Sequence, residues 1–234
     1  MKRREFFRTA ALGAVAAGVV AGCEHGIDGM SKASVKGTPR ALRFKNEQFY
    51  KDGKFNEDAA KDAIIAMCKY YGYPMFPGAR EKMWVSDYNT GQFASLGLSA
   101  FVFASDPAGP YVLMDLFLLP GQMLPEHWHE KDAQGFTKNE GWLVRWGKSH
   151  ITGIGENNRK KFPQIVIPKC HCNGTVTVNH ITAATAGMLV PLAKATTRHW
   201  MMAGPAGAIM TESASCHNSK VTFHSDKKIN AFFL

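Results

Sequence analysis

Two histidines separated by one residue, His127 and His129, constrain the fold of this chain more than any other feature. They follow Gly121 in a short apolar stretch, and side chains alternate between the two faces of an extended strand. Both imidazoles therefore point to one side, while Trp128 points to the other. Because two imidazoles on one face can bind a single ion, the stretch predicts a β-strand that carries part of a metal site.

Two residues further along the chain complete a possible set of metal ligands. Glu140 opens the next β-like run, and six residues separate it from Gly147, so its carboxylate can lie on a neighbouring strand. His199 lies well downstream, directly before Trp200. We therefore predict that one ion is bound by His127, His129, Glu140 and His199.

The spacing of these residues resembles the first cupin motif, which is a glycine, five residues, His-x-His, a spacer, a glutamate, six residues and a second glycine. The spacer between His129 and Glu140 is ten residues, longer than is common in the family. The second cupin motif is present in part: Gly187, Pro191 and His199 occur in order, but Ala203 replaces its terminal asparagine. The resemblance implies a mainly β protein, a cupin-type jelly-roll barrel.

The pattern before the barrel predicts an N-terminal helical extension. Asn56 is a good capping residue, Glu57 and Asp58 supply acids in the first turn, and apolar residues then recur at helical spacing until Gly72. From Trp84 onwards the chain consists of short apolar runs separated by turn residues, which is the pattern of a β-sandwich or jelly roll.

A glycine- and proline-rich segment, residues 204–207, has the composition of a hairpin turn. Such a turn would fold the strand that carries His199 back on itself, as a strand that carries Glu212. The side chain of Glu212 would then reach the same cavity as the metal ligands.

Several segments together resemble the D-lyxose ketol-isomerase family of cupins over nearly the whole chain after residue 45. They are Lys69 to Pro74, Trp84 to Phe93, Leu118 to Gln122 with the following His-x-His, His199-Trp200, and Glu212 to Asn218. The resemblance implies an aldose-ketose isomerase with a divalent metal, Mn²⁺ first and Zn²⁺ or Fe²⁺ as alternatives. It also implies a small sugar as substrate, and we expect a homodimer.

Such an isomerase needs a base that moves a proton between C1 and C2 of the sugar. Glu212 is our candidate base. If the strand continues, Lys131 lies on the same face as His127 and His129. It is our candidate for orienting or protonating a substrate oxygen. Two other functions stay open at this point: a non-catalytic sugar- or metal-binding cupin lipoprotein, and an iron-dependent cupin dioxygenase with the same ligands.

The N-terminal residues predict export. Arg3-Arg4 is a twin-arginine start, and the apolar run from Thr9 to Gly22 is too short to span a bilayer. Val20 to Cys23 resembles a lipobox, in which lipid is attached to Cys23. We therefore expect a signal peptide over residues 1–22, a lipidated tether over 23–45 and the cupin domain over 46–234, anchored to a membrane in the cell envelope.

Net charge and cysteine content indicate which partners and which disulfide to expect. Removal of residues 1–22 leaves 24 Lys and Arg against 18 Asp and Glu, a net charge of +6 without a basic run, so we expect no nucleic-acid partner. The alternating cysteines Cys170 and Cys172 lack the second pair that a zinc site requires. A disulfide between one of them and Cys216 is favoured, because export permits oxidation.

Overall fold

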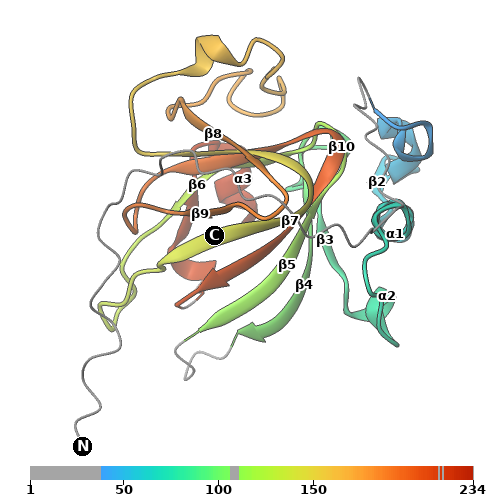
Figure 1. Ribbon diagram of the computed structural model, residues 1–234, viewed down its shortest axis with the longest axis horizontal. Helices are drawn as coiled ribbons and strands as arrows, with labels where there is room; N and C mark the ends of the chain where they lie inside the picture. Colours follow the sequence, from blue (N-terminus) through green and yellow to red (C-terminus); the bar gives the residue numbers. More distant parts are fainter. Residues whose placement is uncertain (1–37, 106–110, 216, 218, 234) are drawn as a thin grey trace, which may run out of the picture. The chain divides into compact units, whose positions relative to one another are not determined.

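The computed structural model describes residues 38–105, 111–215, 217 and 219–233. Its main feature is a curled antiparallel sheet of nine strands, shown in Figure 1. The strands are β3 (Trp84–Ser86), β4 (Leu98–Ser105), β5 (Val112–Leu118), β6 (Met123–His129), β7 (Glu140–Gly153), β8 (His180–Thr185), β9 (Leu189–Pro191), β10 (His199–Ala214) and β11 (Thr222–His224). The mainly β, cupin-type fold predicted from the sequence is confirmed.

Smaller elements precede, interrupt and follow the sheet. A two-stranded hairpin is formed by β1 (Tyr50–Lys51) and β2 (Lys54–Phe55), and the helices are α1 (Glu57–Tyr71), α2 (Ala79–Lys82) and α3 (Lys227–Phe233). Short 3₁₀ helices occupy Arg40–Leu42, Asn46–Phe49, Arg159–Lys161 and Ser219–Val221. In the described part of the chain, no helix is both long and apolar enough to cross a membrane.

Helix α1 begins and ends where the sequence predicts. The side chain of Asn56 accepts a hydrogen bond from the backbone N–H of Ala59, and Gly72 ends the helix in the left-handed conformation. The buried side of α1, which includes Ile64 and Met67, packs with Phe117 of β5 in one hydrophobic cluster. The helical extension thus shares a hydrophobic cluster with the sheet, separate from the inner cluster.

Strand β10 is the longest in the sheet and organises the others. Its first part pairs with β6, its second part pairs with β5, and β7 pairs with it along the opposite edge. Residues from β6, β7 and β10 therefore converge on the concave side of the sheet. This side also carries an apolar cluster that includes Leu116, Trp142 and Met210.

The predicted hairpin turn at residues 204–207 is wrong. Strand β10 runs through this segment, and its pairing with β7 shifts register between Ala203 and Ala208. Both Ala203 and Ala208 belong to the inner cluster, although strict alternation would place them on opposite faces. The β-bulge therefore resets the parity, and this is why His199 and Glu212, an odd number of residues apart, both face inward.

Glycine at two positions allows the bulge to form. Gly147 of β7 has φ +75° and Gly207 of β10 has φ +81°. A Cβ atom on Gly147 would overlap the backbone carbonyl of Gly207, and a Cβ on Gly207 would overlap Met67 of α1. The glycine that ends the first cupin motif is thus required by close contact between two backbones.

Candidate metal centre

The histidine pair lies at the end of β6, next to the start of β10. His127 and His199 are register partners, and the centroids of their rings are 4.1 Å apart. A shift in register between His199 and Met201 separates this pair from the next, Met201 and Leu124. The irregularity lets Leu124, His127 and His129 all line the same cavity.

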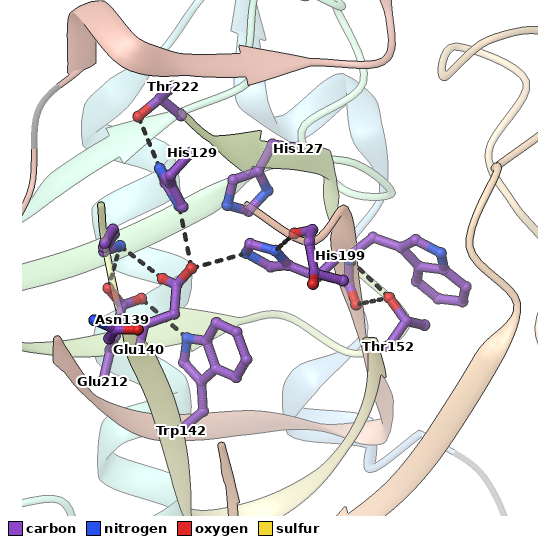
Figure 2. A network of polar contacts seen from close by, with 12 residues as sticks. His127, His129, Asn139, Glu140, Trp142, Thr152, His199, Glu212 and Thr222 are labelled. Carbon is purple, nitrogen blue, oxygen red and sulfur yellow. Dashed lines mark hydrogen bonds and ion pairs between the residues drawn. The ribbon is translucent and has the colours of Figure 1, made fainter. Parts of the chain in front are cut away.

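Three of the predicted ligands meet at one point. Ligand nitrogens of His127, His129 and His199 all lie within 4.8 Å of one another, and all three side chains are buried. Glu140 opens β7 and places Oε1 at 3.2 Å from Nε2 of His129 and 3.4 Å from Nε2 of His199 (Figure 2). The four residues come from three strands, as the motif predicts.

Hydrogen bonds on the far side of each ring orient the three imidazoles. Nδ1 of His127 donates to the carbonyl of Pro125, and Nδ1 of His199 donates to the carbonyl of Thr197, both at 2.9 Å. Nδ1 of His129 lies 3.0 Å from the hydroxyl of Thr222. Because a carbonyl can only accept, the Nε2 atoms of His127 and His199 carry lone pairs, as metal ligands must.

The centre is suited to a cation. Burial and the neighbouring imidazoles lower the pKa of His127, and burial together with His129 lowers the pKa of His199 even though Glu140 opposes it. Nε2 of His129 and Nε2 of His199 lie close to Oε1 of Glu140, and all three atoms are buried without a hydrogen-bond partner. A positive ion between them would satisfy these buried polar atoms, so the donor set fits a divalent metal.

Lys138, which sequence reasoning missed, links the metal centre to a second carboxylate. Its Nζ atom lies 2.8 Å from Oε2 of Glu140 and 2.6 Å from Oε1 of Glu212, and all three residues are buried. Burial alone would lower the pKa of Lys138, but the two carboxylates raise it, so the ammonium stays charged. Burial likewise opposes the charge on Glu140, but Lys138 and His199 hold the pKa of Glu140 well below its usual range.

Glu212 faces the same cavity as the histidines. Its Oε2 atom accepts a hydrogen bond of 3.0 Å from the indole N–H of Trp142, and Oε1 is bound by Lys138 (Figure 2). Glu212 and Lys138 line the cavity of about 380 Å³ that His127 and His129 also line. The carboxylate is therefore paired with an ammonium, fixed in orientation and placed in the cavity lining.

Lys131 is not placed where the parity argument put it. Strand β6 ends at His129, so alternation does not continue to Lys131, which lies exposed in the loop before β7 and outside the cavity lining. Lys138, near the end of the same loop, takes the position beside the carboxylates. The position of Lys138 could not be predicted from side-chain alternation, because the loop has no strand periodicity. The one usable signal is that a lysine lies two residues before a predicted ligand.

Two further side chains of the cavity were not singled out from the sequence. His224 of β11 is the register partner of His127, and its ring centroid lies 5.7 Å from that of His127. Burial lowers the pKa of His224 to about 4, and nearby histidines add to the effect. Tyr88 is buried in the cavity wall with φ +54°, a strained conformation for an aromatic residue.

The Cys170-His171-Cys172 segment does not form a metal site with the described residues. Both ring nitrogens of His171 are engaged, with the Thr175 carbonyl and with the backbone N–H of Glu126, so this histidine is structural. Cys170 and Cys172 are free thiols. Their predicted disulfide to Cys216 stays a prediction, because Cys216 lies outside the described residues.

The fold of this chain is similar to that of solved sugar isomerases. L-ribose isomerase of Cellulomonas parahominis, solved without ligand, matches 83% of this chain and 98% of its own, with a TM-score of 0.53 and 10% identity. The same enzyme solved with L-psicose matches 74% of this chain and 92% of its own, with a TM-score of 0.51 and 11% identity. The chain therefore has a cupin-type fold, and three histidines converge inside it.

Sequence comparison gives a narrower result. The D-lyxose ketol-isomerase of Cohnella laeviribosi is 29% identical over 170 residues, which cover 73% of this chain and 90% of the relative. The D-lyxose/D-mannose isomerase of Thermosediminibacter oceani is 29% identical over 172 residues, which cover 74% and 87%. No protein-family model matches the chain. By sequence, the chain is thus similar to D-lyxose isomerases over about three quarters of its length.

Proposed function

We propose that this protein is a metal-dependent aldose-ketose isomerase of the D-lyxose/D-xylulose type. One observation carries the proposal: the Glu140–Lys138–Glu212 chain joins a histidine-rich cation site to a second carboxylate inside one cavity. A binding protein needs a cation site alone. An isomerase needs, in addition, a base held beside it, and the oriented carboxylate of Glu212 meets that description.

The reaction moves hydrogen without any net oxidation. Glu212 would take the proton from C2 of the open-chain aldose and return it to C1, while the hydroxyl proton on O2 is lost and O1 gains one. The product is the ketose, and the species between is a cis-enediol. When bound, a divalent ion would supply Lewis-acid chemistry by polarising the carbonyl and the adjacent hydroxyl of the sugar.

The protein's own groups prepare this transfer. Trp142 and Lys138 hold the Glu212 carboxylate in one orientation, so it needs no rearrangement before it accepts a proton. Lys138 is the nearest ammonium to that carboxylate, and its charge stabilises negative charge that develops on a substrate oxygen. This role replaces the one predicted for Lys131.

The donor set favours a divalent transition metal. Three imidazoles and one carboxylate suit Mn²⁺, Fe²⁺ and Zn²⁺. We propose Mn²⁺ for the isomerase, because an ion that exchanges oxygen ligands readily suits a polyhydroxylated substrate. Metal analysis of the purified protein, followed by reconstitution with each ion in turn, tests this choice.

The proposed function is tested by incubating metal-loaded protein with a panel of pentoses and hexoses, beginning with D-lyxose. Formation of the matching ketose, lost on chelation and restored by metal, is the expected result. Metal-loaded protein that forms no ketose from any sugar would favour the non-catalytic alternative. Oxygen consumption without ketose formation would favour the dioxygenase.

We also propose that the protein is an exported lipoprotein of the cell envelope. The twin-arginine pair and the lipobox-like residues before Cys23 support this proposal from the sequence alone. The homodimer stays a prediction, which analytical ultracentrifugation of the purified domain would test.

A further inference from the structure

The cavity beside the metal centre has two chemically different sides. The side formed by β6, β11 and the loop before β7 carries His127, His129, Lys138 and His224. The opposite side comes from β4 and β5. Its cavity-lining residues at alternate positions are Leu98, Ala100 and Val102 on β4, and Met114 and Leu116 on β5. Ser105, at the end of β4, is the polar exception among them.

Register across the sheet shows how this apolar wall meets the base. Glu212 is the partner of Met114, and Met114 is the partner of Val102, so the three side chains form one row on the concave face. The next row is Met210, Leu116, Ala100 and Trp84. On the side of Glu212 away from β7, the row thus continues with Met114, which is at best a weak acceptor, and with Val102, which offers a ligand neither donor nor acceptor.

The length of a sugar connects the two sides. Neighbouring strands are about 4.8 Å apart, so Met114 lies one strand spacing from Glu212 and Val102 lies two. A hexose with C2 at Glu212 and its oxygens towards the histidines is long enough to place C6 beside Met114. Met114 is 9% exposed, whereas Val102 is 52% exposed at the mouth. A hydroxyl on C6 would therefore be buried against a thioether side chain that forms at best a weak hydrogen bond.

We propose that the cavity selects aldoses whose carbon chain ends in a methyl group, the 6-deoxyaldohexoses, over those that end in a hydroxymethyl group. This inference rests on the proposed function, because it assumes that C1 and C2 lie at the metal centre. A methyl group gains from contact with Met114 and Leu116, while the corresponding alcohol loses hydration without a replacement.

Three sugars with one configuration at C2, C3 and C4 test the proposal in the metal-loaded protein. D-lyxose carries hydrogen at C5, D-mannose carries a hydroxymethyl group there, and 6-deoxy-D-mannose carries a methyl group. We expect kcat/KM for 6-deoxy-D-mannose to exceed that for D-mannose about 10- to 100-fold, the range in which an apolar pocket rejects an added hydroxyl. Equal values, or a preference for D-mannose, would overturn the proposal.

A matched pair of variants locates the effect. Met114→Gln keeps the length of the side chain and adds a donor and an acceptor, so the ratio of the two kcat/KM values should fall towards one. Leu113→Gln makes a similar change at the next residue of β5, which is 40% exposed and outside the cavity lining, and should leave the ratio unchanged. An unchanged ratio in folded Met114→Gln would show that C6 does not lie at this wall.

Binding separates failure of this inference from failure of the proposed function. Titration of the metal-loaded protein with each sugar, followed by tryptophan fluorescence, needs no turnover. Tighter binding of 6-deoxy-D-mannose than of D-mannose supports the inference even if no ketose forms from any of the three. Ketose formation with the reverse order of binding overturns the inference and leaves the isomerase intact. Absence of binding by all three sugars overturns both.

Discussion

Lys138 gives the candidate site its most unusual property, because one buried ammonium holds both a candidate metal ligand and the candidate base. Its contacts with Glu140 and Glu212 are 2.8 and 2.6 Å. Removal of one member of a buried ion pair leaves an uncompensated charge and costs about 3 to 5 kcal/mol. The three residues are therefore better separated by isosteric changes that keep their volume than by truncation.

The first prediction separates metal binding from catalysis by changing each carboxylate to an amide. Glu140→Gln should lower the metal content, because a neutral amide is a poorer ligand for a divalent cation. Glu212→Gln should keep the metal but lower kcat about 10²- to 10⁴-fold, because the amide cannot accept the substrate proton. Metal content is measured on the purified proteins, and kcat is measured with D-lyxose.

Lys131→Ala is the control for these variants, since Lys131 is exposed and lies outside the cavity. It should retain both metal and rate. If Glu212→Gln retained full metal and undiminished turnover, Glu212 would not be the base. If Lys131→Ala lost turnover with its metal intact, the loop before β7 would have to close over the substrate.

At the residue scale, the sequence predicts which candidate ligands converge better than it predicts their neighbours. His127 and His129 follow from strand parity, and Glu140 and His199 follow from motif spacing, because ligand geometry restricts which positions can serve. Lys138 could not be found in this way, since it lies in a loop without a period. Its position depends on two carboxylates that are 72 residues apart in the chain and meet only in the folded sheet.

At the scale of elements, β10 shows what local patterns miss. The composition of residues 204–207 predicts a turn, and a free peptide of this sequence would have little reason to stay extended. In the folded chain β7 pairs with β10 on both sides of this segment, at Met201 to Ala203 and at Ala208 to Ala214, so this pairing and the Gly147–Gly207 contact favour a bulge over a turn. Tertiary pairing therefore overrides local propensity at this position.

The second prediction tests the contact between these strands. Gly147→Ala should destabilise the protein by about 3 kcal/mol or more, because its Cβ would overlap the Gly207 carbonyl and its positive φ disfavours alanine. Gly153→Ala is the control, at the end of the same strand, where an added Cβ meets nothing within 4 Å. It should change the free energy of unfolding by no more than about 0.5 kcal/mol.

Urea unfolding of both variants measures these differences. A Gly147→Ala protein as stable as Gly153→Ala would mean that the two backbones do not approach closely, and the account of the bulge would fail. If Gly147→Ala does not fold, Gly147→Ser is measured in the same urea series and should be destabilised in the same way. A Gly147→Ser protein as stable as Gly153→Ala would contradict the close approach of the two backbones.

The third prediction concerns the start of α3. Oδ1 of Asp226 accepts from the N–H of Lys228 at 2.9 Å, and Oδ2 accepts from the N–H of Cys172 at 2.7 Å. Burial opposes the charge on Asp226, but these backbone bonds hold its pKa below the usual value. Because the folded pKa is lower than the unfolded one, the stabilisation is present above about pH 4 and is lost as the pH falls through the folded pKa.

Asp226→Asn should therefore cost about 1 to 2 kcal/mol at neutral pH, because the amide keeps one oxygen and leaves one of the two backbone N–H groups without its acceptor. Its deficit relative to the unchanged protein should shrink as the pH is lowered below about 4. Exposed Glu47→Gln is the control for the loss of one negative charge and should show little deficit at any pH. A deficit for Asp226→Asn that stays constant down to pH 2 would contradict the assignment.

At the scale of the whole molecule, the fold class was predictable because it depends on repeated features. Short apolar runs, the glycine frame and the capped helix each specify a local structure, and together they agree with one architecture. The apolar wall of β4 and β5 was not predictable, since it depends on the register of Met114 against Glu212 and of Val102 against Met114. Register across strands has no signature in a single sequence.

The last prediction concerns where the whole molecule works. Val20 to Cys23 predicts lipid attachment, and two acyl chains anchor a domain stably where one does not. Cys23→Ala should therefore move the protein from the membrane fraction to the soluble fraction or leave it unprocessed, while Ser31→Ala, in the same segment, should change neither. Cell fractionation and labelling with radioactive palmitate measure both effects. Arg3→Lys together with Arg4→Lys should leave full-length precursor in the cytoplasm. Membrane association that survives Cys23→Ala, with cleavage at another residue, would mean that Cys23 does not carry the lipid anchor.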